Sequence, residues 1–395
     1  MDTTDYPTLL SGFDMWDPAH ERWKLDAFAY ARRHCPIVHT SAGTGFWLIT
    51  RYEDTRRILE DWETFSSVHG SPTPTPVRLG PVDCDPPHQT TLRALINRVL
   101  SRAFALRFSG EMRRVARELI EEWIDDGEVE LMSGFASPFV SRVLARVVFD
   151  EDDPEGMERA KRIVARVVED GSPEAFLQLA TLSGEYLAQA RKNPPDRDGL
   201  LRRLVTGTVD GRPVTDEDAF GTLNVVLLGG LDTTRSAIGH IALHMALDPG
   251  LEQRVRDPRW ITRDLDEFIR VQSPVATYAR NITRDVEVGG VQMRAGERVL
   301  IRYDSANRDE ARFPDPDRLV FDPPRPSNAG FGLGVHRCLG MHLARVQLAV
   351  AFDELLNRIT GLRLACKPHD IVWAPGITTA PDRIPLDFDR LGGSR

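Results

Sequence analysis

Apolar residues recur at helical spacing through most of the middle of the chain. This period predicts helices over residues 88–100, 109–126, 138–149, 155–169, 173–191 and 198–206. A further helix is expected to begin after Thr215, where Glu217 and Asp218 place acidic side chains in the first turn, and to run to Leu247. Helices are also predicted over residues 262–271 and 339–358. The chain is therefore expected to be mainly α-helical.

Strand-like runs are short and flank this helical stretch. They are predicted over residues 37–40, 45–50, 286–288 and 298–301, with a helix over 52–60 and a hairpin-like C-terminal tail. The proline-rich residues 66–87 predict a long loop. Because no repeat or linker interrupts the chain, we predict one mainly α domain with minor β structure over residues 1–395. Its β-containing lobe is expected at about 1–60 and 275–325, and its helical lobe at about 88–272 and 339–358.

Composition excludes several classes of protein. The chain carries 59 acidic and 50 basic side chains, a formal net charge of -9, and no basic stripe, which argues against nucleic acid as the main partner. No apolar run reaches the roughly 18 residues of a membrane span. The 4 cysteines are far apart, which disfavours disulfides and a structural zinc site. We expect a monomeric cytoplasmic protein that does not bind membranes.

Residues 331–340 (Phe-Gly-Leu-Gly-Val-His-Arg-Cys-Leu-Gly) carry the strongest chemical pattern. A thiolate that ligates iron needs shelter from solvent, backbone N–H donors and a nearby helix N-terminus. Two glycines allow a tight turn beside Cys338, Phe331 can shield the sulfur, and the last predicted helix follows directly. Taken alone, a buried cysteine is more often inert. A dinucleotide-binding loop is excluded because Arg337 stands where the third glycine is required.

At these residues the sequence resembles a soluble bacterial cytochrome P450, a haem-thiolate monooxygenase. The family motif F-G-x-G-x-H-x-C-x-G-x-x-L-A-R is matched at every fixed position from Phe331 to Arg345. The resemblance implies the cytochrome P450 fold, a single large helical domain with small sheets around a buried haem b (iron protoporphyrin IX). It makes Cys338 the axial iron ligand and places Phe331 and Gly340 at the cofactor.

A carboxylate interrupts the otherwise neutral helix that follows Thr215. Between residues 218 and 248 the only formally charged side chains are those of Asp232 and Arg235. Two preceding glycines weaken the helix by roughly 1 kcal/mol each, and Thr233 can bond back to a carbonyl. From this segment alone, a kinked core helix with one ion pair is an equally good interpretation. The family has A-G-x-[DE]-T here, which implies that Asp232 relays protons with Thr233 as its partner, and Gly229 in place of alanine is expected to be tolerated.

Two further segments match the family less specifically. Glu267 and Arg270 stand at i and i+3, a common helical pair that here matches the E-x-x-R motif, with Arg318 as the expected third member. Residues 85–93 resemble D-P-P-x-H-x-x-x-R, but Gln89 occupies the place of the histidine and His88 lies one position early, without an assigned role. The resemblance assigns the haem propionates to Gln89, Arg93, Arg280 and His336.

The implied activity is oxidation, such as hydroxylation, of a small to medium apolar molecule in natural-product biosynthesis or catabolism. Molecular oxygen would be the oxidant, and the two electrons would come from NAD(P)H through a ferredoxin reductase and a ferredoxin. A peroxygenase that uses H₂O₂ is the alternative, which an intact Asp232 and Thr233 argue against. Oxidative coupling or cyclisation uses the same motifs and stays open. A haem-binding sensor without turnover is disfavoured because the motifs are complete.

The resemblance also implies two surfaces. An apolar substrate pocket is expected from residues 66–84, 228–229, 275–277 and 377–379. A basic face for an acidic electron carrier is expected from Arg98, Arg102, Arg107 and Arg345. His240 and His244 share a helical face, but the glutamate of a zinc motif is missing, so we interpret them as packing or surface residues.

Overall fold

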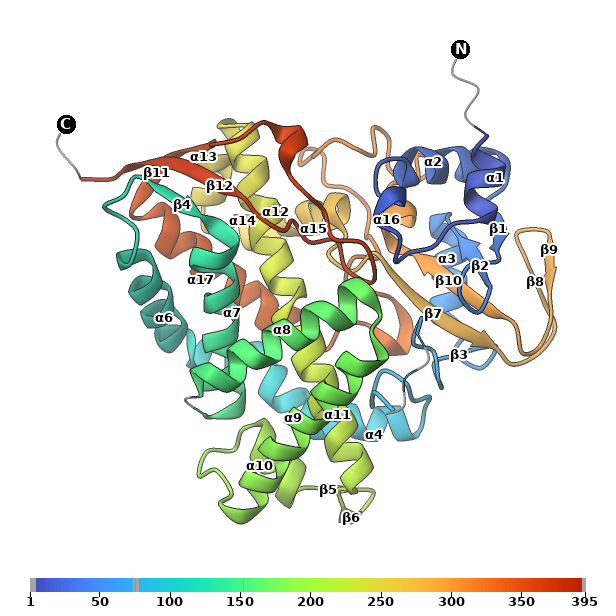
Figure 1. The fold of residues 1–395 in the computed structure, drawn as a ribbon, viewed down its shortest axis with the longest axis horizontal. Coiled ribbons are helices and arrows are strands. Elements are labelled where there is room, and N and C mark those ends of the chain that lie inside the picture. Colours follow the sequence, from blue (N-terminus) through green and yellow to red (C-terminus); the bar gives the residue numbers. More distant parts are fainter. Residues whose placement is uncertain (1–4, 74, 76–77, 152, 393–395) are drawn as a thin grey trace.

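The computed structural model describes residues 5–73, 75, 78–151 and 153–392. Helices fill most of it, and a five-stranded sheet with α1 (Tyr6–Ser11) and α2 (Lys24–His34) lies to one side (Figure 1). The longer helices are α3 (Tyr52–Glu60), α4 (His88–Leu100), α6 (Ser109–Glu121), α8 (Pro154–Asp170), α9 (Pro173–Lys192), α11 (Asp216–Leu231), α12 (Thr233–Leu247), α15 (Leu265–Gln272) and α17 (Met341–Leu356). Shorter ones are α5 (Arg102–Arg107), α7 (Ser137–Val143), α10 (Leu200–Thr206), α13 (Gly250–Arg256), α14 (Trp260–Arg263) and α16 (Tyr303–Ala306).

The main sheet has the strand order β1-β2-β10-β7-β3. These strands are β1 (Ile37–Thr40), β2 (Phe46–Ile49), β3 (Phe65–Ser66), β7 (Thr277–Ile282) and β10 (Arg298–Arg302). β10 runs parallel to β2 and antiparallel to β7, which joins the N-terminal strands to the segment after α15. A second sheet consists of β11 (Ile359–Leu364), β12 (Pro385–Arg390) and β4 (Glu128–Glu130). Two hairpins complete the described strands, β5 (Thr208–Val209) with β6 (Arg212–Pro213) and β8 (Val286–Val288) with β9 (Val291–Met293).

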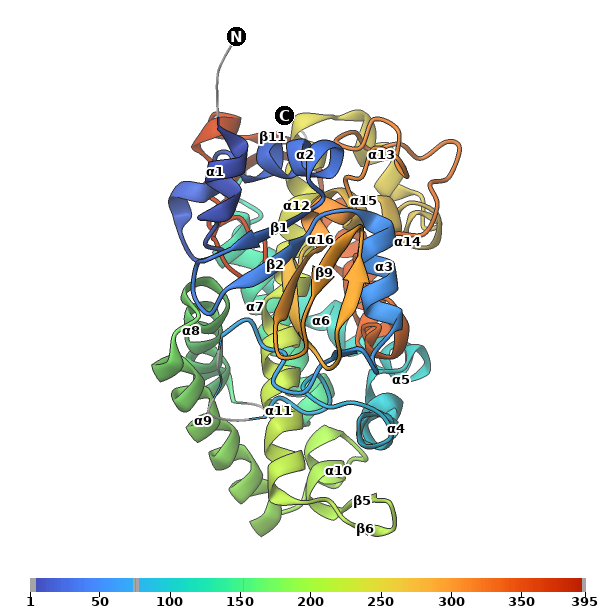
Figure 2. The same cartoon turned by 90° about the vertical axis from the view of Figure 1, so that its right-hand side faces the viewer.

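Helix α17 explains how the core is organised. It packs against α5, α6 and α12, so apolar side chains are needed on several of its faces. Its buried Glu354, which is 2% exposed, accepts hydrogen bonds from Arg117 and Arg113 of α6 at 2.9 and 2.8 Å. The helix that follows the cysteine loop is thereby held in the centre of the molecule. Figure 2 shows α3 beside the main sheet, and α3 also contacts the loop that precedes α17.

The continuous helix predicted from Thr215 to Leu247 is wrong in one respect. Thr215 does cap the helix, accepting the amide of Asp218 at 3.1 Å, but α11 ends before Asp232 and α12 begins after it. At the break the Thr233 hydroxyl donates to the carbonyl of Gly229 at 2.7 Å, which replaces regular backbone pairing locally. α11 and α12 follow one another through the middle of the molecule (Figure 1). The predicted helix 262–271 is likewise divided, at Asp264, into α14 and α15.

No helix in the described part of the chain combines the length and the apolar composition that crossing a membrane requires.

Candidate active site at the cysteine loop

The loop before α17 is shaped by two glycines. Gly332 and Gly334 have φ of 69° and 66°, values that other residues rarely adopt, and a Cβ atom on Gly334 would lie 2.2 Å from the carbonyl oxygen of Leu59. The amide of Cys338 donates to the carbonyl of Phe331 at 2.8 Å, which closes the turn. The loop therefore needs glycine both for its backbone conformation and for its close approach to α3.

The sulfur of Cys338 lies among protein atoms but keeps an open side. Burial raises the pKa of the Cys338 thiol, and hydrogen bonds from the backbone of Gly340 and Met341 together with the charge of Arg93 oppose this shift. Nevertheless Cys338 is an exposed residue, and a Cβ on Gly229, in the middle of the fold, would meet nothing within 4 Å. The backbone donors at the start of α17 are placed to stabilise a thiolate at Cys338.

Two arginines and a histidine gather beside this loop, and none of them pairs with a carboxylate of the described residues. Arg93 of α4 donates to the carbonyl of Arg337 at 2.6 Å, and Arg280 of β7 donates to the carbonyl of Ala279 at 2.7 Å. Burial, followed by the charges of Arg280 and Arg93, lowers the pKa of His336 to about 3, and its buried Nε2 has no partner among the described residues. Such a set of unneutralised donors fits an anionic ligand, and the carboxylates of haem b meet that requirement.

The two predicted residues at the start of α4 have different contacts. Gln89 is buried, and its amide donates to the carbonyl of Val335 at 2.7 Å, so it supports the cysteine loop directly. His88 lies 2.8 Å from the carboxylate of Asp218 on α11. The histidine is therefore an interhelical contact, while the glutamine takes a place beside the candidate site.

At the break between α11 and α12, a buried carboxylate is only half satisfied. Asp232, which is 3% exposed, accepts two hydrogen bonds from Arg235 on Oδ1, at 3.1 and 2.5 Å, while Oδ2 has no partner among the described residues. The neighbouring Thr233 has its hydroxyl on the carbonyl of Gly229. A carboxylate and a hydroxyl side by side at a helix break can hold and transfer protons.

The E-x-x-R pair is part of a buried network, and its third arginine differs from the prediction. Glu267 accepts two hydrogen bonds from Arg270, both at 2.8 Å. Arg318 contributes only its carbonyl, which Arg270 reaches at 3.0 Å, whereas the side chain facing Glu267 is that of Arg325, at 3.6 Å. The prediction of Arg318 was wrong because the chain reverses within residues 316–325, so the spacing along the sequence did not identify the side chain that points inward.

Sequence reasoning also missed Glu169. Its carboxylate, near the end of α8, lies 3.9 Å from Arg235. No pattern in the sequence marks it, because its relation to Asp232 depends entirely on how α8 packs against α11.

Two of the predicted pocket segments lie together. Val275 and Thr378 form a β-bridge, and the amide of Ala276 donates to the carbonyl of Ile377 at 2.8 Å. Ser236 and His240 of α12 hold the carbonyl of Thr379, which ties this tail to the helix after the break. His240 stacks on Trp373 and is thus a packing residue. In the predicted loop 66–84, positions 74 and 76–77 lie outside the described residues.

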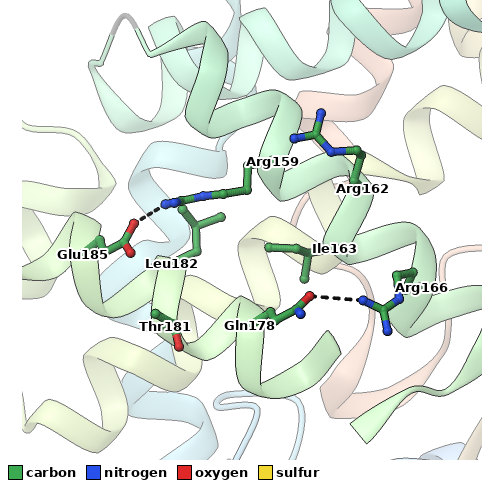
Figure 3. Close-up of a pocket in the computed structure, with 8 residues that line it drawn as sticks. All are labelled: Arg159, Arg162, Ile163, Arg166, Gln178, Thr181, Leu182 and Glu185. Carbon is green, nitrogen blue, oxygen red and sulfur yellow. Dashed lines mark hydrogen bonds and ion pairs between the residues drawn. The ribbon is translucent and has the colours of Figure 1, made fainter. Parts of the chain in front are cut away.

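An open groove of about 460 Å³ between α8 and α9 is a separate feature (Figure 3). Arg159 pairs with Glu185, and Arg166 donates to Gln178 at 3.3 Å. None of the predicted site residues lines this groove, and two of its three arginines, Arg159 and Arg166, pair with glutamates.

The arginines expected to form a docking face are not equivalent. Arg98 is 75% exposed and lies 3.5 Å from Asp198, while Arg102 and Arg107 are exposed on α5. Arg345 is instead half-buried, pairs with Asp266 and stacks against Phe331 with 5.4 Å to the ring centroid. Arg345 therefore supports the cysteine loop rather than adding a free charge to the surface.

Comparisons with known proteins agree with this geometry. The family model described as Cytochrome P450 matches residues 262–372. Cytochrome P450 107B1 of Saccharopolyspora erythraea is 30% identical, over 94% of this chain and 96% of that protein. Mycinamicin IV hydroxylase/epoxidase of Micromonospora griseorubida is 31% identical, over 86% and 88% respectively. The structure of a P450 EryK mutant in complex with erythromycin B matches with a TM-score of 0.85 at 26% identity, covering 96% of this chain and 99% of that one.

These relationships extend over nearly the whole chain, and the relatives' names include hydroxylases and epoxidases. They confirm the predicted mainly helical fold with small sheets, the oxidoreductase class and the haem b cofactor, which the family binds through a cysteine thiolate. The chain belongs to the cytochrome P450 family of haem-thiolate monooxygenases.

Proposed function

We propose that this enzyme inserts one oxygen atom of O₂ into a small to medium apolar molecule, and that the thiolate of Cys338 would hold the haem iron. The observation that carries the proposal is the setting of that sulfur. It lies at the start of α17 with the amides of Gly340 and Met341 directed at it, and it keeps an open side although protein surrounds it. Bound haem supplies the binding and activation of oxygen.

The chain supplies binding, positioning and protons. Arg93, Arg280 and His336 would hold the propionates, because they are cationic or donor groups without carboxylate partners in the described residues. Gln89 supports the loop through Val335, and Phe331 and Gly340 shape the surroundings of the sulfur. Asp232 receives protons and passes them toward the reaction centre with the help of the Thr233 hydroxyl.

The proposed substrate is an uncharged organic molecule of the natural-product type. The segments that meet at Val275 and Thr378 carry no charged side chain, which favours an apolar ligand. The names of the relatives above point in the same direction, since one acts on mycinamicin IV and another binds erythromycin B. We assign electron delivery to a ferredoxin, docked near the exposed Arg98, Arg102 and Arg107.

The decisive experiment is optical. The reduced, haem-loaded protein should give the strongly red-shifted Soret band of a thiolate-ligated carbon monoxide complex, and Cys338→Ala should abolish that band. Retention of the band in the variant would refute the role of Cys338.

Turnover driven by NADPH, ferredoxin and reductase, compared with turnover driven by H₂O₂, then separates the monooxygenase from a peroxygenase. Optical titration with candidate compounds identifies the substrate by displacement of iron-bound water.

A further inference from the structure

The guanidinium of Arg235 lies between two carboxylates from different helices. Its Nη2 atom donates to Oδ1 of Asp232 at 2.5 Å and lies 3.9 Å from Oε1 of Glu169, near the C-terminal end of α8. The side chains of Asp232 and Arg235 are 4% and 13% exposed, while that of Glu169 is 32% exposed. Glu169 is thus the member of this cluster that reaches solvent, and Asp232 is the one at the helix break.

We propose that Glu169 is a positioning residue for the Asp232 proton relay, acting through Arg235, so that the charge of Glu169 controls how tightly the relay carboxylate is held. This proposal rests on the function proposed above, in which Asp232 transfers protons.

The physical reason is competition for one cation. A guanidinium does not release its proton, so Arg235 cannot itself conduct protons and acts as a fixed positive charge. When Glu169 is protonated, Arg235 pairs with Asp232 alone. When Glu169 is ionised, the same Nη2 is shared, and the hold on Oδ1 of Asp232 weakens. A less tightly held Asp232 is freer to take up a proton and to turn its unpartnered Oδ2 toward Thr233.

The surroundings place this change of charge near neutral pH. Burial raises the pKa of Glu169 to about 7; the charge of Asp232 adds to the shift, and Arg235 opposes it. The other charged groups that face Glu169 are Asp170 on α8 and Asp382 before β12, and both favour the protonated form. The end of α8 is anchored to the C-terminal tail, where the amide of Ile377 donates to the carbonyl of Val168 at 2.9 Å. The position of Glu169 is therefore defined by the contacts of α8 with α11 and with the tail.

The test compares wild type with Glu169→Gln, Glu169→Asp and the control Glu158→Gln. Glu158 lies on the same helix, is 44% exposed and pairs with Lys161. Haem-loaded proteins are supplied with NADPH, a ferredoxin, its reductase and O₂, and NADPH consumption is followed in H₂O and D₂O from about pH 6 to 8. Infrared difference spectra of the carboxyl stretching region, recorded without turnover, report the protonation of Glu169 directly.

We expect the wild-type rate to rise through about pH 7, and the Glu169→Gln rate to be independent of pH and about three- to tenfold lower at pH 8, with a larger solvent isotope effect. Glu169→Asp should keep the rise, and Glu158→Gln should match wild type. A carboxyl band that titrates near pH 7 should vanish in Glu169→Gln.

A Glu169→Gln variant that follows the wild-type pH profile would overturn the proposal, as would the absence of that carboxyl band. The carbon monoxide band separates this outcome from a failure of the proposed function. If wild type itself lacks the thiolate band, the function is wrong; if all proteins show it and only the pH profiles disagree, the role of Glu169 alone is wrong.

Discussion

Two buried ion pairs of this enzyme have the same sequence pattern, an acid followed three residues later by arginine. Glu267 and Arg270 are 6% and 0% exposed, and Asp232 and Arg235 are 4% and 13% exposed. Their shortest contacts are also alike, at 2.8 and 2.5 Å. Neither spacing nor burial distinguishes the two pairs.

They differ in how completely their polar atoms are satisfied. Arg270 donates to both oxygens of Glu267 and to three carbonyls, and the amide of Val320 also donates to Glu267 at 2.8 Å. In the other pair, Oδ2 of Asp232 has no partner in the described residues. A saturated network stabilises one arrangement, whereas a buried oxygen without a partner retains the capacity to bind a proton or water. The completeness of hydrogen bonding therefore distinguishes the structural pair, Glu267 and Arg270, from the pair proposed to take part in proton transfer, Asp232 and Arg235.

The largest expected effect is on the saturated pair. Arg270→Met should lower the free energy of unfolding by about 3–5 kcal/mol, because the buried Glu267 carboxylate loses its cation and three buried carbonyls lose the donor they share. Chemical denaturation of the haem-loaded protein measures the loss. The control Arg56→Met removes an exposed pair with Glu53 and should cost at most about 1 kcal/mol. Equal losses in the two variants would show that saturation does not matter here.

At the unsaturated pair we expect a loss of activity with little loss of stability. Asp232→Asn keeps the size of the side chain but removes the ionisable oxygen, so NADPH-driven turnover should fall by roughly 10²-fold. The free energy of unfolding should change by less than about 1 kcal/mol, and the carbon monoxide band should persist. Asp216→Asn, an exposed position at the start of α11, is the control and should leave turnover unchanged. If Asp232→Asn lowers the free energy of unfolding without a specific loss of turnover, the role of Asp232 is structural.

A third kind of site is an arginine, such as Arg93, that has no carboxylate partner among the described residues. Arg93→Met should increase the rate of haem loss by about tenfold, because one charge-assisted hydrogen bond to a propionate is removed. Transfer of haem to apomyoglobin measures this rate. Arg98→Met changes an exposed arginine of the same helix and should retain haem as wild type does. A haem-loss rate in Arg93→Met equal to that of the control would contradict propionate binding.

The smallest expected effect is on the pH dependence of the free energy of unfolding. Folded Glu169 keeps its proton up to about pH 7, whereas an unfolded glutamate releases it near pH 4.3, as model peptides do. Raising the pH between these values therefore removes stability, and the loss is complete above the folded pKa. Glu169→Gln lacks this slope, so it should gain about 1 kcal/mol relative to wild type between about pH 5 and pH 8, a figure reduced for solvent screening. Denaturation midpoints at both pH values provide the test, and parallel curves would contradict the raised pKa.

Local patterns predicted much of the fold. The predicted helix 88–100 and strands 37–40 and 286–288 coincide with α4, β1 and β8, because apolar periodicity directly reflects which face is buried. The interior strand β7, between β10 and β3, was missed, since Arg280 and Asn281 interrupt its apolar pattern. Both polar side chains have uses that the sequence does not reveal: Arg280 lies near His336, and Asn281 donates to the carbonyl of Val68 at 2.6 Å.

The roles assigned to Cys338, Phe331, Gly340, Asp232 and Thr233 came from contiguous motifs and remain predictions for the experiments above. The structure places each motif where such a role is physically possible. It corrected the third member of the E-x-x-R network, where two distant segments had to meet, as with Arg318 and Arg325.

The sequence by itself indicated the cysteine loop, because glycines at positions 332 and 334 permit the positive φ that its tight turn requires within ten residues of chain. It also determined where a carboxylate enters an apolar helix. Tertiary structure alone decided which charges share a partner. Arg235 faces Glu169 because α8 packs against α11, which ends at the helix break, and Glu267 faces Arg325 because the chain folds back after α16. Electrostatic interactions depend on distance in space, and the order of residues does not specify that distance between remote segments.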